Sequence, residues 1–195
     1  HKNKQMPKLV ELTRRLHTAA RMLEHPPLFR LMRAGGSPRL FLDMNQPWVH
    51  ALNIRTILDI GANRGQFALT MEALFPQARI IAFEPLPELF AALSRHAQTE
   101  PRFQAIRCGL GDSNGELSFN KLALDASSSF LKPNAVLKAA APDITASEEV
   151  TAPVRRLDDV MAEHDIDDAL FIKLDVQGFE DRVIRGGEAT FRRAA

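Results

Sequence analysis

The chain has 195 residues, 45% of them hydrophobic and 25% charged, with a formal net charge of +1 at pH 7, which is ordinary for a soluble globular protein. No apolar run approaches the roughly 20 residues that a membrane-spanning helix needs, and the opening has no signal-peptide core. The single cysteine, Cys108, excludes an internal disulfide and fits a reducing compartment, so we expect a cytoplasmic protein.

The first 39 residues are basic, with nine Lys or Arg side chains against two acidic ones, whereas the remainder is acidic. Within them, an apolar stripe at helical spacing predicts an amphipathic helix that ends at Pro26. The stripe consists of Leu9, Leu12, Leu16, Ala20 and Leu23. We therefore divide the chain into a helical appendage, 1–39, and a core domain, 40–195. The basic face is either solvated or a contact for nucleic acid, a membrane surface or an acidic partner.

The chain is organised around residues 56–67, T-I-L-D-I-G-A-N-R-G-Q-F. Residues 56–60 are β-branched and apolar and end at Gly61, which predicts a buried strand. Apolar residues then recur at helical spacing until Pro76, so a helix begins near Gly65. A strand, a glycine-bearing turn and a helix form the ligand-holding corner of an α/β sheet.

This turn is not a dinucleotide fingerprint, because Asn63 and Gln66 stand where G-x-G-x-x-G needs glycine. The carboxylate of Asp59 also disfavours a pyrophosphate, which prefers N–H groups and positive charge. A cationic ligand suits it better, and S-adenosylmethionine carries both a sulfonium and an ammonium group. The alternative is a tight turn with an incidental aspartate.

Two further strands follow in chain order. The strand at 78–83 ends in Glu84, which either accepts hydrogen bonds from ribose hydroxyls or favours the start of the next helix through its charge. A strand at 103–108 leads to Asp112, which either binds an adenine amino group or is a turn aspartate. The dipeptide Asn114-Gly115 predicts a hairpin that returns the chain as an antiparallel strand.

The segment 124–149 has no periodic pattern, and we expect it to form a mobile lid over the acceptor. A short strand at 150–154 and a short helix from Leu157 precede a strong strand at 169–176. By topology this is the fourth parallel strand and lies beside the first. Asp175 at its end should then meet Asp59, Glu84 and Asp112 in one crevice.

Several segments resemble the FkbM-type methyltransferases that use S-adenosylmethionine. They are D-I-G-A-N-R-G-Q-F at 59–67, A-F-E-P-L-P-E-L-F at 82–90, V-R-R-L-D-D-V at 154–160 and I-K-L-D-V-Q-G-F-E at 172–180, together with the G-L-G-D segment at 109–112. The resemblance covers about residues 53–191 in the family's order.

The resemblance implies a Rossmann-like class I methyltransferase sheet and methyl transfer to a hydroxyl oxygen of a sugar, glycolipid or polyketide-like small molecule. It implies that the cofactor's methionine end binds at the first motif, the ribose at the second and the adenine at the G-L-G-D segment. The implied cofactor residues are Asp59, Gly61, Ala62, Asn63, Gly65, Phe67, Glu84, Pro85, Leu110, Asp112 and Asp175. Asp175 would face the transferring methyl group and is our candidate catalytic base, with Glu180 and Lys173 weaker candidates.

The chain departs from the family at two points. Gln177 stands where the family commonly has glutamate, and the chain stops at Ala195, where the family would continue into three more strands. We therefore expect the chain as given to be incomplete at its C-terminus, to bind cofactor weakly and not to turn over.

Two other classes of function compete with methyl transfer. A nucleic-acid protein using the basic arm is disfavoured, because the arm lacks interleaved aromatic side chains and the chain has no tyrosine. A non-catalytic scaffold is favoured slightly by Gln177 and by the expected absence of the C-terminal strands. The intact turn after the first strand and Glu84 disfavour it. Metal chemistry is not expected, because the six histidines show no ligand spacing. Oligomeric state is not predictable from these patterns.

Overall fold

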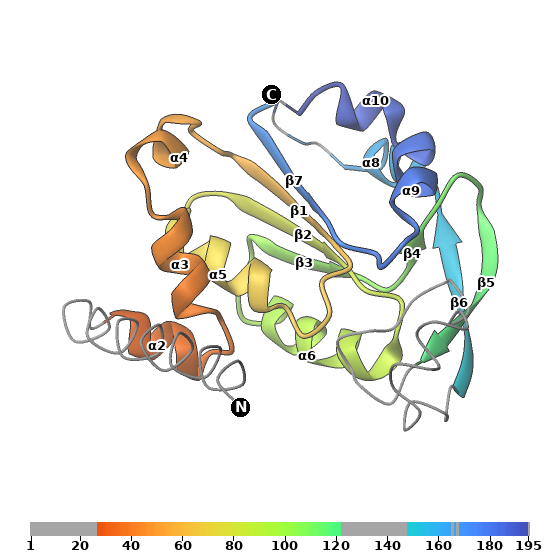
Figure 1. Ribbon diagram of the computed structural model, residues 1–195, viewed down its shortest axis with the longest axis horizontal. Helices are drawn as coiled ribbons and strands as arrows, with labels where there is room; N and C mark the ends of the chain where they lie inside the picture. The colour runs from red at the N-terminus through yellow and green to blue at the C-terminus, as the bar shows by residue number, and fades with distance from the viewer. Residues whose placement is uncertain (1–26, 122–147, 165, 167, 195) are drawn as a thin grey trace, which may run out of the picture.

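The computed structural model describes residues 27–121, 148–164, 166 and 168–194. Its centre is a four-stranded parallel sheet in the order β3-β2-β1-β7 (Figure 1). These strands are β1 (Thr56–Ile60), β2 (Arg79–Phe83), β3 (Phe103–Ile106) and β7 (Leu170–Leu174). The predicted α/β class and the place of the fourth parallel strand beside the first are therefore confirmed.

Helices cover both faces of this sheet (Figure 1). They are α2 (Pro27–Arg33), α3 (Pro38–Met44), α4 (Pro47–Ala51), α5 (Gln66–Leu74), α6 (Pro87–Ala97), α8 (Leu157–Met161), α9 (Glu180–Gly186) and α10 (Glu188–Phe191). Successive residues of β1 point to opposite faces of the sheet. Ile57 belongs to a hydrophobic cluster with Met71 of α5, and Leu58 belongs to a second cluster with Val160 of α8. All five residues of β1 are buried, as expected for a central parallel strand with both faces covered.

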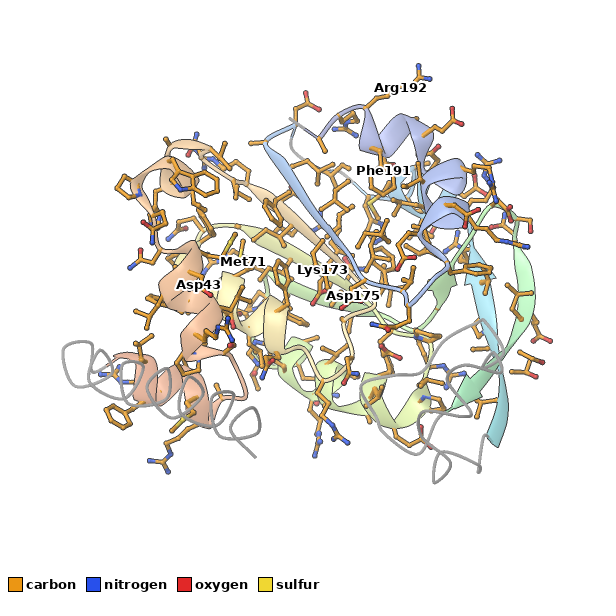
Figure 2. The ribbon with its side chains drawn as sticks, viewed as in Figure 1. Asp43, Met71, Lys173, Asp175, Phe191 and Arg192 are labelled. Atoms are coloured by element: carbon orange, nitrogen blue, oxygen red, sulfur yellow. The ribbon has the colours of Figure 1, made fainter. Side chains whose placement is uncertain are left out.

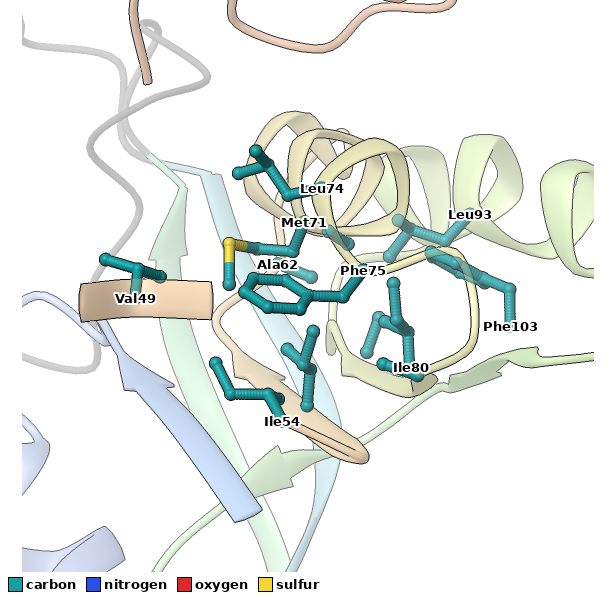
Figure 3. Close-up of a cluster of buried hydrophobic side chains, with 13 residues drawn as sticks. Val49, Ile54, Ala62, Met71, Leu74, Phe75, Ile80, Leu93 and Phe103 are labelled. Atoms are coloured by element: carbon teal, nitrogen blue, oxygen red, sulfur yellow. The ribbon is translucent and has the colours of Figure 1, made fainter. Parts of the chain in front are cut away.

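The first of these clusters joins α4, α5 and α6 to the sheet (Figure 3). Phe75, Ile80 and Phe103 are its large members, from the end of α5 and from β2 and β3. The side chains of α5 thus pack the helix against one face of the sheet, beside β1 and β2.

A second, three-stranded sheet has the order β4-β6-β5, with β4 at Gly109–Leu110, β5 at Gly115–Lys121 and β6 at Glu148–Arg155. The predicted strand 103–108 is therefore too long, because β3 ends at Ile106 and the chain crosses to the other sheet. The predicted hairpin at Asn114-Gly115 is wrong, because β5 pairs antiparallel with β6, and β4 lies parallel to β6 on its other side.

The side chain of Asn114 explains the failed hairpin. Its amide donates to Asp159 Oδ2 at 2.7 Å and its carbonyl oxygen accepts from the backbone N–H of Arg156 at 2.8 Å. The dipeptide therefore ties the second sheet to the start of α8 instead of closing a two-stranded turn.

The N-terminal helices pack on α5. Ser37 caps α3 by accepting from the N–H of Leu40, and its own N–H donates to Thr70 Oγ1 of α5 at 2.9 Å. Leu28 of α2 is fully buried. The predicted boundary at residue 39 falls inside α3, and the division into appendage and core stays a prediction.

Two predicted features lie outside the described residues: the amphipathic helix within 1–26 and nearly all of the predicted lid, of which only Glu148 and Glu149 are described, in β6. At the outer edge of β7, Leu170 forms an isolated parallel bridge with Ala194. Among the helices of the described residues, none combines the length and apolar character required to cross a membrane.

Candidate functional site

The turn after β1 has a left-handed backbone at three positions. Gly61 has φ +76° and Gly65 φ +83°, and Asn63 between them has φ +53°. A Cβ on Gly61 would lie 2.1 Å from the backbone oxygen of Asp175. Glycine is therefore required where the turn passes against the end of β7, and this contact brings the ends of β1 and β7 together.

Asp59 of β1 lies in register with Lys173 of β7. The carboxylate is fully buried, and the Lys173 ammonium lies 3.1 Å from its Oδ1. Neither carboxylate oxygen has a hydrogen-bond partner in good geometry among the described residues. Burial raises the pKa of Asp59, and the attraction of Lys173 opposes that rise without cancelling it.

Lys173 makes further contacts at this corner. Its Nζ donates to the carbonyl oxygen of Gly61 at 2.7 Å, lies 3.8 Å from Asp175 Oδ2 and stands 5.9 Å from the centre of the Phe67 ring. Figure 2 shows Lys173 and Asp175 close together where β1 and β7 end. Lys173 was only a weak base candidate from the sequence. In the predicted strand 169–176, Lys173 and Asp175 are two residues apart, so their side chains are expected on one face. This spacing was the signal that could have identified Lys173.

Asp175 is the accessible carboxylate of this group. Its side chain is 56% exposed, and the amide nitrogen of Gln177 donates to its Oδ1 at 2.8 Å. Gln177 itself has φ +55°. Glu180, the other weaker base candidate, accepts from the N–H groups of Val176 and Gly178 and so closes the loop into α9.

Glu84 lies at the end of β2 and is 5% exposed. Its Oε2 accepts from the N–H of Asn63 at 2.9 Å and its Oε1 from the N–H of Leu86 at 3.0 Å. Burial raises the pKa of Glu84, and these two N–H groups oppose the rise. Glu84 thus holds the turn after β1, and Pro85 beside it is partly buried.

The residues of the predicted adenine end have partners of their own, and their role stays a prediction. Asp112 forms ion pairs with Arg182 and Arg185 of α9, at 4.0 and 3.4 Å, and Leu110 is buried in the core at 1% exposure. Among the described residues, the structure therefore links Asp59, Glu84 and Asp175 through Lys173 and the turn, and it gives Asp112 partners on α9.

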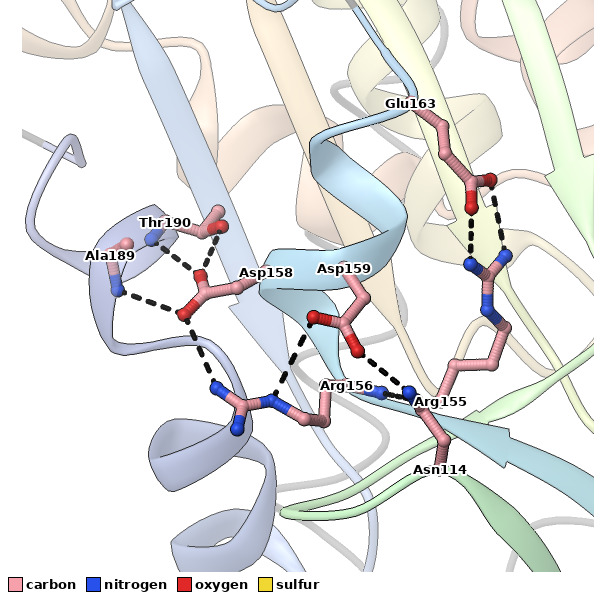
Figure 4. Close-up of polar contacts among 8 residues, drawn as sticks. All are labelled: Asn114, Arg155, Arg156, Asp158, Asp159, Glu163, Ala189 and Thr190. Atoms are coloured by element: carbon pink, nitrogen blue, oxygen red, sulfur yellow. Dashed lines mark hydrogen bonds and ion pairs between the residues drawn. The ribbon is translucent and has the colours of Figure 1, made fainter.

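The V-R-R-L-D-D-V motif is an anchor for the last helix (Figure 4). Asp158 accepts from the N–H of Ala189 at 3.2 Å and from both the N–H and the hydroxyl of Thr190 at 2.8 Å each. Partial burial acts to raise the pKa of Asp158, but the hydrogen bonds from Thr190 outweigh it, and the pKa is lowered. This motif joins α8 to α10 at the start of the latter helix.

The parallel sheet with helices on both faces defines a Rossmann-like α/β domain. Residues 59–195 match the methyltransferase FkbM domain, so the chain belongs to that family. Within the described residues there is no group of three or more His, Cys, Asp or Glu side chains that could hold a metal ion.

Three relatives show how far the likeness extends. The chain is 31% identical to methyltransferase sdnD of Sordaria araneosa, over 67% of this chain and 59% of that protein. It is 30% identical to the 2-O-methyltransferase NoeI of Sinorhizobium fredii, over 70% of this chain and 59% of that protein. It is 28% identical to the 31-O-demethyl-FK506 methyltransferase FkbM of Streptomyces tacrolimicus, over 71% of this chain and 63% of that protein. The chain thus spans about three fifths of the length of these relatives.

Proposed function

We propose that the protein is an S-adenosylmethionine-dependent methyltransferase that methylates a hydroxyl oxygen of a sugar, glycolipid or polyketide-like small molecule. Family membership supports methyl transfer, and two relatives carry names that specify an O-methyl group. The observation that carries the proposal is the meeting of Asp59, Glu84 and Asp175 at the ends of three adjacent parallel strands.

The residues at this corner fit a ligand with a cationic end and a ribose. Among the described residues, three carboxylates and the Lys173 ammonium lie together at this corner, and a surplus of carboxylates favours a cationic ligand. Each oxygen of Glu84 accepts one backbone N–H and has a further lone pair for a hydroxyl donor. When bound, S-adenosylmethionine supplies a methyl group that is already activated by the sulfonium.

Each protein group then has a limited task. Gly61 and Gly65 allow the backbone to approach the ligand closely. Asp175, exposed at the end of β7, accepts the proton of the acceptor hydroxyl. Gln177 keeps its carboxylate oriented through the 2.8 Å hydrogen bond. The acceptor has to be aligned about 3 Å from the methyl carbon, because misplacement by about 1 Å costs about 100-fold in rate.

Calorimetry tests the cofactor part of the proposal. For a form of the protein extended past residue 195, we expect S-adenosylmethionine and S-adenosylhomocysteine to bind in the micromolar range and NAD to bind negligibly. Glu84→Ala should weaken binding by about 1–3 kcal/mol, because it strands the partners of a charged hydrogen bond. NAD binding without binding of either S-adenosyl ligand would overturn the proposal.

The acceptor part is tested by methyl transfer to a panel of hydroxyl-bearing sugars, glycolipids and polyketides. Transfer of a labelled methyl group to an oxygen of one class identifies the substrate class. Transfer to a nucleic-acid base would contradict the proposed class. In a form extended past residue 195, cofactor binding with no transfer to any hydroxyl or base would favour the non-catalytic scaffold.

A further inference from the structure

Asp59 and Lys173 form an ion pair where β1 and β7 end, and this pair affects how the proposed cofactor would be held. The sequence pattern alone suggests that Asp59 binds the cationic end of the ligand directly. In the structure Asp59 is fully buried, whereas the Lys173 side chain is 20% exposed and stands 3.1 Å from Oδ1. A ligand cation reaches Asp59 only if it displaces this ammonium.

Lys173 is held in place by more than Asp59. It donates to the Gly61 carbonyl at 2.7 Å, lies 3.8 Å from Asp175 and faces the ring of Phe67. The Gly61 contact joins the turn after β1 to strand β7, at the point where the Gly61 backbone already touches Asp175. A side chain fixed by the fold competes with a free ligand at high effective concentration.

The energetics point the same way. A buried carboxylate without a compensating charge is costly, and removal of one partner of a buried pair destabilises strongly because the other is stranded. Removal of both partners is often neutral. A positioning pair and a direct ligand therefore respond differently to single and double substitution.

We infer that Lys173 is a positioning residue: it neutralises Asp59 and ties the Gly61 turn to β7, so that Asp59 acts on ligand binding through Lys173 and not as a ligand of the cation. This inference rests on the proposed function, since S-adenosylhomocysteine is the probe.

A double-mutant cycle tests it, with wild type, Asp59→Asn, Lys173→Met and the double variant, each checked for folding by thermal unfolding. We expect each single substitution to weaken S-adenosylhomocysteine at least about fivefold in calorimetry. The double variant should bind at least about fivefold more tightly than either single variant. A smaller recovery, or singles that bind like wild type, overturns the inference. The exposed pair Arg39 and Asp43, 3.7 Å apart, is the matched control, and its single and double neutral variants should bind like wild type.

A second measurement on the wild-type protein covers variants that fail to fold. Acetylation of Lys173 by acetic anhydride is followed by mass spectrometry and normalised to the other lysines. Saturating S-adenosylhomocysteine should not raise the rate at Lys173. A rise above about twofold would mean that the ligand has displaced the ammonium from Asp59, which overturns the inference. Absence of binding to wild type would instead overturn the proposed function.

Discussion

Two aspartates from motifs of the same family have opposite environments. Asp59, at the end of β1, is fully buried beside one ammonium, and neither of its oxygens has a well-placed hydrogen-bond donor among the described residues. Asp158, at the start of α8, has a side chain 20% exposed and accepts from two backbone N–H groups and a hydroxyl. Their pKa values shift in opposite directions: burial raises that of Asp59, and the Thr190 hydrogen bonds lower that of Asp158.

The contrast distinguishes Asp158, which anchors a helix, from Asp59, which belongs to the candidate functional site. The carboxylate of Asp158 is satisfied by the chain's own donors, so its charge is used within the fold to hold α10. The carboxylate of Asp59 is incompletely compensated, and groups of this kind in clefts are candidates for function. Motif resemblance alone does not distinguish the two.

The largest expected effect is that of Gly61→Ala in the site region. A Cβ there meets the Asp175 backbone oxygen at 2.1 Å in a left-handed conformation, so we expect a loss of about 3 kcal/mol or more in the free energy of unfolding. Urea denaturation measures it. Gly115→Ala is the control, because nothing lies within 4 Å of its Cβ, and it should change stability by less than about 0.5 kcal/mol. Equal effects of the two would contradict the close contact of β7 with the turn.

Asp175→Asn tests the chemical side of the comparison. Because the side chain is 56% exposed, the fold should be unaffected. In a form extended past residue 195, loss of the base should lower turnover at least about 100-fold, with affinity for S-adenosylhomocysteine within about twofold. Steady-state kinetics and calorimetry on the same preparation measure both. If binding is lost while turnover at saturation is unchanged, Asp175 holds the cofactor and the base lies elsewhere.

Asp158→Asn tests the anchor. The amide would turn an N–H toward the N–H of Ala189, so we expect a loss of about 1–2 kcal/mol at pH 7 with ligand affinity unchanged. Urea denaturation at several pH values shows whether the contribution of Asp158 to stability rises or falls with pH. Since the pKa of Asp158 is lowered on folding, its contribution is present above its ordinary value of 3.8 and is lost as pH falls through the folded value.

The contribution of Asp59 to stability should change with pH in the opposite direction. Because its pKa is raised on folding, its contribution to stability is fully present below 3.8 and is lost as pH rises through the folded value. The stability difference between wild type and Asp59→Asn should therefore shrink as pH rises, whereas the difference for Asp158→Asn should grow. Slopes of the same sign would remove the distinction between anchor and site.

The smallest effect is expected at the exposed pair of Asp168 and Arg193, 2.8 Å apart, with the Asp168 side chain 85% exposed. Asp168→Asn should cost less than about 1 kcal/mol, and the loss should decline with added salt. It should leave turnover unchanged, which makes it the matched control for Asp175→Asn. A loss above about 2 kcal/mol would show that exposed carboxylates also anchor this fold.

Much of the fold could be predicted because its signals are local. The apolar run at 56–60 and the glycine after it predict β1 and its turn, and the structure has them at those residues. The run at 169–176 likewise predicts β7, found at Leu170–Leu174. The hairpin prediction failed because the local signal of Asn114-Gly115 does not show which strand will pair with the one that follows. Here Asn114 bonds to residues at the start of α8, and β5 pairs with β6, which is distant in the sequence.

By itself, the sequence determined the alternation of strands and helices, the glycine turn and which carboxylates end the strands, because these depend on residue periodicity and backbone conformation. Only the tertiary structure decided what each carboxylate meets. The register of β1 with β7 sets Lys173 beside Asp59, and the packing of α10 on α8 sets Thr190 beside Asp158. Charge compensation depends on distances of a few ångströms between residues far apart in the chain, and no local pattern encodes them.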